Sequence, residues 1–194
     1  MKRIDLSVQI SQSKWRELFG AEQLAGAGHI GTHFDVMNTT FDFESIKLPG
    51  KIIDVSGVRE RDIDILDVGA TEIRAHDFVI FHTGFLQAVG YGTPAYRYRM
   101  DHPQLARDLL RLLIEKQVSL IGLDAPGVRR GDEHAPTDQW CADHGVFIVE
   151  NLANTVLLLQ AAGQRPFTVY TFPLSIAELT GLPCRVIAEI KSSA

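Results

Sequence analysis

Short apolar runs of strand length recur along the whole chain and restrict it to folds that contain a sheet. Alternating apolar residues at Ile4, Leu6 and Val8 predict a first strand with one buried face. Several of the later runs are rich in Val and Ile, as buried strands are. These later runs cover residues 51–55, 78–81, 118–123, 146–149, 167–172 and 185–190.

Helical patterns lie between these runs. Residues 103–116 carry leucines at helical spacing and predict an amphipathic helix with Pro103 in its first turn. Thr137 is a suitable N-cap for a second helix that ends near Gly145, and residues 11–20 predict a shorter one. This mixture indicates an α/β or α+β fold with more than one sheet. No linker divides the chain, so residues 1–194 are expected to form a single domain.

Charge and hydropathy narrow the class of partner. The chain has 24 acidic and 19 basic residues and a net charge of -5, so it lacks the basic field that nucleic acids and anionic membranes require. Neither a secretory signal nor a run of roughly 18 to 20 apolar residues is present. We expect a cytoplasmic protein with a small-molecule substrate and no nucleic-acid or membrane partner. Cys141 and Cys184 are far apart and are expected to act as small hydrophobic residues.

The segment from Gly28 to Asp35 places His29, His33 and Asp35 at alternate positions. On a straight strand the two histidines would be roughly 13 Å apart, too far to bind one ion. Gly31 lies between them and makes a bend inexpensive, because it lacks a Cβ. Imidazole and carboxylate ligands suit zinc, manganese or iron(II), and three protein ligands leave positions open for water and substrate. We therefore expect one divalent metal ion, with zinc or manganese favoured.

These residues carry a resemblance. The pattern His29-x-Gly31-Thr32-His33-x-Asp35 resembles the first part of H-x-G-T-H-x-D-x-P-x-H, the signature of the cyclase family that includes kynurenine formamidases and isatin hydrolases. Residues 81–85 resemble the family's strand and T-G-aromatic turn, and residues 145–152 resemble its strand ending in E-N-L. The resemblance implies that His29, His33 and Asp35 bind the metal and that Glu150 reaches the same centre.

The resemblance also implies a fold and an assembly. The family has a swivelling β/β/α layered fold of the α/β class, with a central, mainly parallel sheet, an additional antiparallel sheet and helices on one side. Its members tend to form dimers or tetramers, so a homodimer or homotetramer is expected here.

The chain departs from the family pattern at positions that matter for proton transfer. Met37 replaces the proline of the signature, and Thr39 replaces its last histidine. Asp138 occupies the place of a histidine that the family commonly has twelve residues before the glutamate of E-N-L. Since a carboxylate can still bind a metal, Asp138 and Glu150 are expected to be additional metal ligands or bases.

Two other histidines lie where they could replace the missing one. His134 is four residues before Asp138, so one helical turn would bring both side chains to the same centre. We expect Glu150, His134 and Asp138 to be the catalytic residues that transfer protons. His82, at the end of its strand, is interpreted instead as a pocket-wall or core histidine.

A substrate pocket is expected from nearby apolar and polar side chains. Arg129 and Arg130 could pair with a substrate carboxylate or form local salt bridges. Tyr91, Tyr96 and Tyr98 could line an aromatic pocket or pack a long loop. The residues predicted to line the pocket are Phe34, Thr39, His82, Phe85 and Arg129.

The favoured function is that of a metal-dependent hydrolase of the arylformamidase-like class. It would use metal-activated water to open or cleave a small cyclic or acylated carbonyl compound, such as an amide, lactam, lactone or ester. Thr39 keeps two alternatives open: a catalytically impaired protein that binds metal and a small ligand, and a metal-assisted cyclase or lyase.

Overall fold

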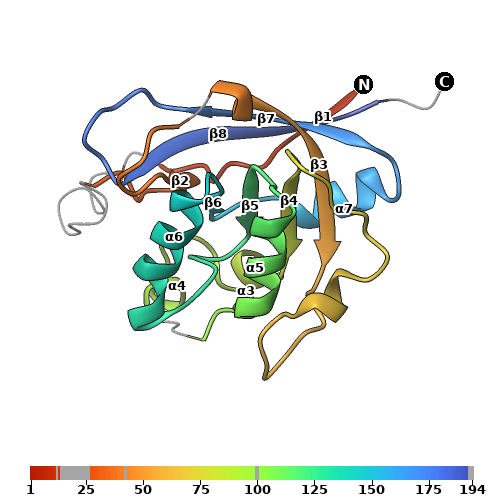
Figure 1. Cartoon of the computed structure of the whole chain (residues 1–194), viewed down its shortest axis with the longest axis horizontal. Helices are drawn as coiled ribbons and strands as arrows, with labels where there is room; N and C mark the ends of the chain where they lie inside the picture. The colour runs from red at the N-terminus through yellow and green to blue at the C-terminus, as the bar shows by residue number, and fades with distance from the viewer. Residues whose placement is uncertain (12, 14–26, 42, 99–100, 192–194) are drawn as a thin grey trace.

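The computed structural model of the whole chain describes residues 1–11, 13, 27–41, 43–98 and 101–191 (Figure 1). Its strands are β1 (Lys2–Asp5), β2 (His33–Asp35), β3 (Lys47–Asp54), β4 (Phe78–His82), β5 (Leu120–Leu123), β6 (Phe147–Glu150), β7 (Phe167–Pro173) and β8 (Gly181–Ile190). Its α-helices are α3 (Phe85–Val89), α4 (Pro94–Tyr98), α5 (Arg107–Glu115), α6 (His134–Asp143) and α7 (Thr155–Ala162). Three 3₁₀ turns are η1 (Phe43–Ile46), η2 (Ile65–Val68) and η3 (Gly131–Glu133).

The sheet is mixed and closes on itself. Its strand order is β1-β8-β2-β6-β5-β4-β3-β7, and a further pairing of β7 with β8 joins seven of the strands into a barrel. Strands β3 to β6 are parallel, whereas β2, β7 and β8 pair with their neighbours antiparallel. The expected separate antiparallel sheet is therefore not formed. The antiparallel strands continue the parallel sheet, because β7 bonds to β3 on one side and to β8 on the other.

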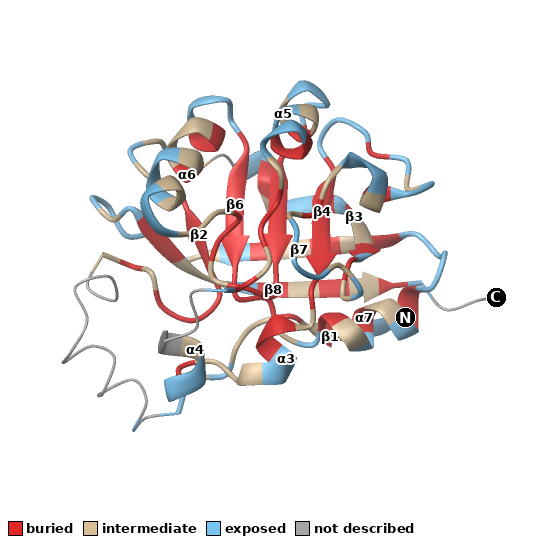
Figure 2. Ribbon diagram, turned by 90° about the horizontal axis from the view of Figure 1, so that it is seen from below, coloured by how far each residue is buried: buried red, intermediate tan, exposed pale blue. Residues whose placement is uncertain are grey.

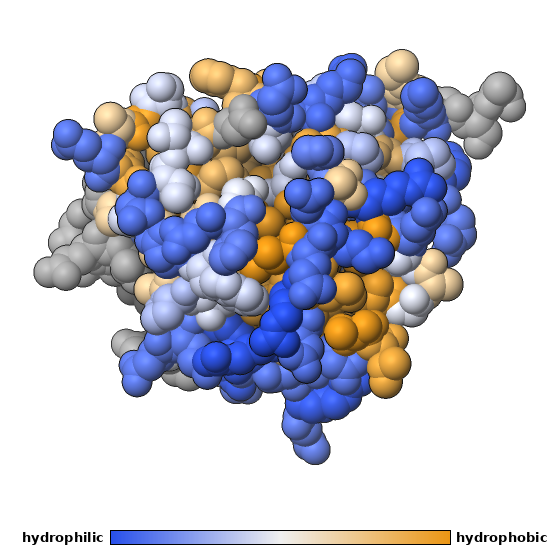
Figure 3. All heavy atoms as spheres, in the orientation of Figure 1, coloured by the Kyte–Doolittle hydropathy of each residue, from blue (hydrophilic) through white to orange (hydrophobic). Residues whose placement is uncertain are grey.

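The parallel strands are buried on both faces, as β4 shows. Phe78 and Ile80 belong to the apolar cluster shared with α7 and β8, while Val79 and Phe81 pack with the cluster of α5 and α6. Figure 2 shows these strands as buried ribbons between helices whose outer sides are exposed. The face that carries α5 and α6 is mostly hydrophilic (Figure 3). Parallel strands of this kind direct their carboxyl ends to one edge, where ligands commonly bind.

The predicted strands are all present, with small shifts at their ends. The helix expected over residues 103–116 is observed as α5, but the second predicted helix starts earlier than its expected cap. Helix α6 begins at His134 rather than after Thr137, because η3 leads directly into it and Pro136 is compatible with a first helical turn. Most of the helix expected over residues 11–20 lies outside the described residues. Within the described part, no helix is long and apolar enough to cross a membrane.

Candidate metal centre

His29, His33 and Asp35 converge on one point because the chain bends before β2. Gly31 adopts a φ of 63°, so only His33 and Asp35 lie on the strand, while His29 lies in the loop that precedes it. The His29 Nδ1 atom is 2.9 Å from Asp35 Oδ1 and 3.2 Å from His33 Nε2. His33 and Asp35 are buried, and the three side chains present ligand atoms that could hold a metal ion.

A second group of potential ligands comes from α6 and β6. His134 and Asp138 are one turn apart on the helix, and Glu150 is the last residue of the strand. The His134 Nε2 atom is 3.1 Å from Asp138 Oδ2 and 3.2 Å from Glu150 Oε1. His134, Asp138 and Glu150 thus form a second triad that could hold a metal ion.

The two triads are adjacent, and Glu150 contacts both. Strands β2 and β6 pair with His33 opposite Glu150, which places the His33 Nε2 atom 3.5 Å from Glu150 Oε2. The other oxygen of Glu150 faces His134. The structure therefore brings together all six residues that the sequence predicted as metal ligands or proton-transfer groups.

The electrostatics of the first triad favour a protonated His33 beside an ionised Asp35. Burial acts to lower the pKa of His33, but the hydrogen bond and charge of Asp35, with the charge of Glu150, raise it to about 9. Burial acts to raise the pKa of Asp35, yet hydrogen bonds from His29 and His33 hold it well below its ordinary value. Asp35 is therefore an anion at neutral pH.

The second triad contains an opposed pair of shifts. Burial acts to lower the pKa of His134, but Glu150 and Asp138 raise it to about 10. Burial raises the pKa of Asp138 to about 9, and the negative charge of Asp35 acts in the same direction. The cluster thus neutralises its buried carboxylates with protons, which a divalent cation can replace.

The donor set fits a metal ion. Asp35 Oδ2 and Asp138 Oδ1 are buried oxygens without a hydrogen-bond partner among the described residues. A buried carboxylate oxygen is costly unless it is paired or coordinates a metal. Together with three imidazoles, these oxygens form the mixed N/O set that zinc, manganese and iron(II) accept.

A hydrogen-bond network that sequence reasoning missed holds the bend of the first triad. The carbonyl oxygen of Gly31 accepts from Asn151 Nδ2 at 3.3 Å and lies 3.0 Å from His33 Nδ1. The Gly31 N–H donates to the Tyr91 hydroxyl at 2.6 Å, and the Tyr96 hydroxyl donates to Asn151 Oδ1 at 2.7 Å. In the neutral imidazole that a metal requires, an Nδ1 proton directed at this carbonyl would leave the lone pair of His33 Nε2 facing the carboxylates.

The residues predicted to line a pocket are distributed over different environments. Phe34 is fully buried in the core, and Thr39 donates its hydroxyl to the carbonyl of Val36. His82 is buried, with Nδ1 2.7 Å from the Thr155 hydroxyl. Arg129 is paired with Asp62 at 2.6 Å and with Glu133 at 2.6 Å, which matches the salt-bridge alternative. The side chain of Tyr98 lies outside the described part of the chain.

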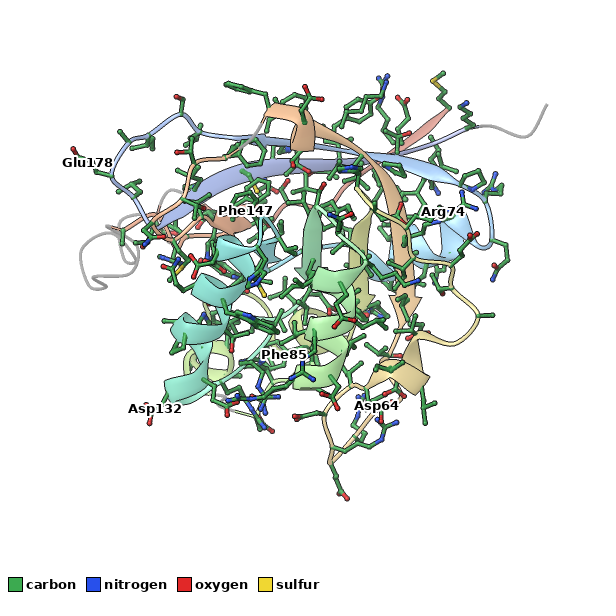
Figure 4. The ribbon with its side chains drawn as sticks, viewed as in Figure 1. Asp64, Arg74, Phe85, Asp132, Phe147 and Glu178 are labelled. Atoms are coloured by element: carbon green, nitrogen blue, oxygen red, sulfur yellow. The ribbon has the colours of Figure 1, made fainter. Side chains whose placement is uncertain are left out.

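A cavity of about 620 Å³ opens near the carboxyl ends of β3 and β4. Of the predicted pocket residues, Phe85 lines it. Figure 4 shows Phe85 and Phe147, the first residue of β6, at opposite ends of the parallel strands. Arg130, which the sequence analysis considered as a partner for a substrate carboxylate, and His102, which it did not single out, also line the cavity. Arg130 directly precedes η3, which leads into α6, so the cavity lies near the end of α6 that carries His134.

A mixed α/β barrel with a buried His/Asp/Glu cluster beside the ends of its parallel strands defines a candidate metalloprotein. The family model described as "Putative cyclase" matches residues 4–130, more than half of the chain. The chain therefore belongs to the cyclase family, as its motifs indicated.

Individual proteins agree with this membership. A kynurenine formamidase from Bacillus thuringiensis (strain Al Hakam) is 26% identical over 170 residues, which covers 82% of this chain and 75% of that protein. A solved structure described as a potential metal-dependent hydrolase with cyclase activity has a TM-score of 0.70 and 22% identity, over 96% of this chain and 98% of the other. Isatin hydrolase A from Ralstonia solanacearum has a TM-score of 0.69 and 22% identity, over 83% of this chain and 72% of the other. At these identities the two structures establish the fold.

Proposed function

We propose that the protein is a metal-dependent hydrolase that opens or cleaves a small amide, lactam, lactone or ester. One observation carries this proposal: six histidine and carboxylate side chains converge, and buried carboxylate oxygens of the cluster, among them Asp35 Oδ2 and Asp138 Oδ1, lack a hydrogen-bond partner among the described residues. The kynurenine formamidase and isatin hydrolase relatives support the choice of carbonyl compounds.

His29, His33 and Asp35 would hold the ion, with Asp138 and Glu150 as further ligands. A divalent ion at this place supplies a Lewis acid that polarises a carbonyl and lowers the pKa of a water molecule. Glu150 would act as the base, because its carboxylate lies between the two triads, 3.5 Å from His33 Nε2 and 3.2 Å from His134 Nε2. His134 is placed to pass a proton to the leaving group, since its imidazole adjoins both Asp138 and Glu150.

The adjacent cavity is proposed as the substrate site. Phe85 and His102 form an edge-to-face ring pair in its wall, with centroids 5.9 Å apart, and provide a surface for a planar group. Its volume is within the range of small-molecule sites. A substrate bound there would approach the metal centre from the side of His134.

Thr39 favours a second candidate, a protein that binds metal and ligand without turnover. Its hydroxyl is bonded to the Val36 carbonyl, and a threonine is a poor proton-transfer group at neutral pH. A metal-assisted lyase or cyclase would use the same ligands without adding water to the product.

Elemental analysis of protein purified without added metal or affinity tag, beside a His33→Ala variant, tests the proposal. We expect about one equivalent of zinc, manganese or iron, lost in the variant while its circular dichroism is retained. Two equivalents would mean that the second triad also holds an ion. Absence of metal from both proteins, even after reconstitution with Zn²⁺ or Mn²⁺, would exclude the hydrolase.

A substrate screen then separates the three candidates. Formamides, lactams and lactones are incubated with the metal-loaded protein in ¹⁸O-labelled water. Incorporation of one labelled oxygen into the product indicates hydrolysis, whereas an unlabelled product indicates a lyase or cyclase. Binding without turnover across the screen supports the second candidate.

A further inference from the structure

Gly127 lies in the loop between β5 and α6, directly beside the imidazole of His134. Its φ of +103° is in the range that favours glycine. A Cβ at this position would be 2.5 Å from His134 Cε1 and 2.8 Å from His134 Nδ1. Real side chains do not approach so closely, so the ring occupies the space that any other residue at position 127 would need.

The loop around Gly127 is fixed on both sides and cannot withdraw from the ring. The Gly127 N–H donates to the Ala125 carbonyl at 3.1 Å, and the same carbonyl accepts from the Asn151 N–H at 3.2 Å. The Val128 carbonyl accepts from the Leu105 N–H at 3.0 Å. The next residue, Arg129, forms ion pairs with Asp62 and Glu133. The added Cβ would also lie 3.1 Å from the Arg129 carbonyl oxygen, but its closest approach is to the His134 ring. Because the ring is the end of a flexible side chain, we expect the ring to move rather than the backbone.

A displaced His134 ring would lose its contacts with two carboxylates. His134 Nε2 is 3.1 Å from Asp138 Oδ2 and 3.2 Å from Glu150 Oε1, and these distances depend on the ring lying over Gly127. Without it, the second triad would consist of two carboxylates alone. Figure 4 shows Asp132, which lies in η3 two residues before His134, at the end of the molecule where α6 begins.

We infer that Gly127 is a positioning residue, whose missing side chain admits the imidazole of His134 to the metal centre. The functional effect of Gly127 rests on the proposed function, in which the His134 imidazole binds metal or transfers a proton. The steric conflict itself is between Gly127 and the His134 ring. Alanine at this position would therefore move the His134 ring out of its place beside Glu150.

Zinc binding to Gly127→Ala, His134→Ala and the double variant tests the inference. We expect Gly127→Ala to lower the Zn²⁺ affinity, measured by competition with a chromophoric chelator, about tenfold or more. His134→Ala should cause a similar loss, and the double variant should be no weaker than His134→Ala. The matched control is Gly131→Ala, which has a φ of +57° but no heavy atom within 4 Å of its added Cβ; it should bind zinc within about twofold of wild type.

Other outcomes decide against the inference. Wild-type affinity in Gly127→Ala, or losses that add in the double variant, would overturn it. If Gly127→Ala does not fold, the double variant should fold, because removal of the imidazole makes room for the methyl group; failure of both would mean that backbone strain, not His134, requires the glycine.

A metal-free readout separates this inference from the proposed function. If the wild-type protein binds neither Zn²⁺ nor Mn²⁺, the proposed function fails, and crystal structures of wild type and Gly127→Ala decide the steric claim. We expect His134 Nε2 to lie beyond hydrogen-bond distance of Glu150 in the variant. An unmoved ring would overturn the inference.

Discussion

Asn151 shows how one residue outside both triads determines their geometry. It follows Glu150 directly and adopts a φ of 58°, a left-handed conformation that asparagine tolerates better than most residues. Its amide donates to the Gly31 carbonyl, and its own backbone carbonyl accepts from the Thr32 hydroxyl at 2.7 Å. Asn151 therefore links the end of β6, which carries one triad, to the bend that forms the other.

Removal of the Tyr96 hydroxyl should weaken this link. In Tyr96→Phe the ring still packs against Tyr91 and Phe85, but Asn151 Oδ1 loses its donor. We expect a loss of about 1 to 2 kcal/mol in the free energy of unfolding by urea, together with weaker zinc binding. Tyr170→Phe is the control, because its hydroxyl makes only a 3.5 Å contact with Glu189. Equal effects of the two variants on zinc binding would contradict a role for Tyr96 in positioning.

His102 should make the stability of the protein depend on pH. Burial lowers its pKa to about 4, with the positive charges of Arg130 and His134 acting in the same direction and Asp101 and the Pro103 carbonyl opposing them. Because the unfolded chain has a pKa near 6.5, it binds a proton below that pH while the folded protein does not. The contribution of His102 to the free energy of unfolding is therefore fully present above about pH 6.5. It declines as the pH falls toward 4, by up to about 3 kcal/mol.

Urea unfolding at several pH values between 7.5 and 4.5 measures this effect. His102→Gln should flatten the decline relative to wild type, since the carboxylates that titrate in both proteins cancel in the difference. Parallel pH profiles for the two proteins would show that His102 titrates normally in the folded state.

At the scale of elements, α5 docks against the outer face of the parallel strands through a stripe of leucines. Leu113 is fully buried in the cluster that includes Val79 and Ile121, whereas Leu112 is partly exposed. We expect Leu113→Ala to cost about 2 to 5 kcal/mol of unfolding free energy, because it leaves a cavity that the packed sheet cannot fill. Leu112→Ala removes the same atoms from a partly exposed position about 100° further round the helix, and it should cost clearly less. Comparable losses in urea unfolding would mean that α5 does not dock as described.

The elements that could be predicted from the sequence are those with a regular apolar pattern. Helix α5 has a clear leucine stripe, and the buried strands are short runs bounded by turn residues. Helix α7 has an almost entirely apolar first part, without the polar face that marks a surface helix, and α3 and α4 are too short to show a period. Closure of the barrel depends on β7 pairing with β3, and no local pattern specifies a partner so distant in the chain.

The metal centre was predictable where ligands lie close together in sequence. His29, His33 and Asp35 form a local motif, and the bend at Gly31 followed from the spacing. The short distance between His134 and Glu150 requires α6 to begin at His134. The sequence predicted an N-cap at Thr137 instead, which would leave His134 outside the helix. The support from Asn151, Tyr91 and Tyr96 involves contacts across the fold, so it had no sequence signal beyond the aromatic character of the loop.

At the scale of the whole molecule, the metal centre lies where a bound ion should stabilise the entire barrel. Its ligands come from β2, β6 and α6, and β2 pairs with both β6 and β8, which connects the parallel strands to the antiparallel ones. An ion that joins these elements stabilises the folded state and not the unfolded chain. Zinc at about 100 times its dissociation constant should therefore add about 2.7 kcal/mol of stability.

Thermal unfolding with and without Zn²⁺ measures this stabilisation. For a chain of this size we expect the melting temperature to rise by about 5 to 11 °C. His33→Ala should lose most of the rise, because the variant lacks the imidazole whose Nε2 faces both Asp35 and Glu150. Arg111→Ala, on the exposed side of α5, should keep it. A rise of equal size in wild type and His33→Ala would mean that zinc binds elsewhere on the protein, since only an ion held by β2 can connect the two halves of the sheet in this way.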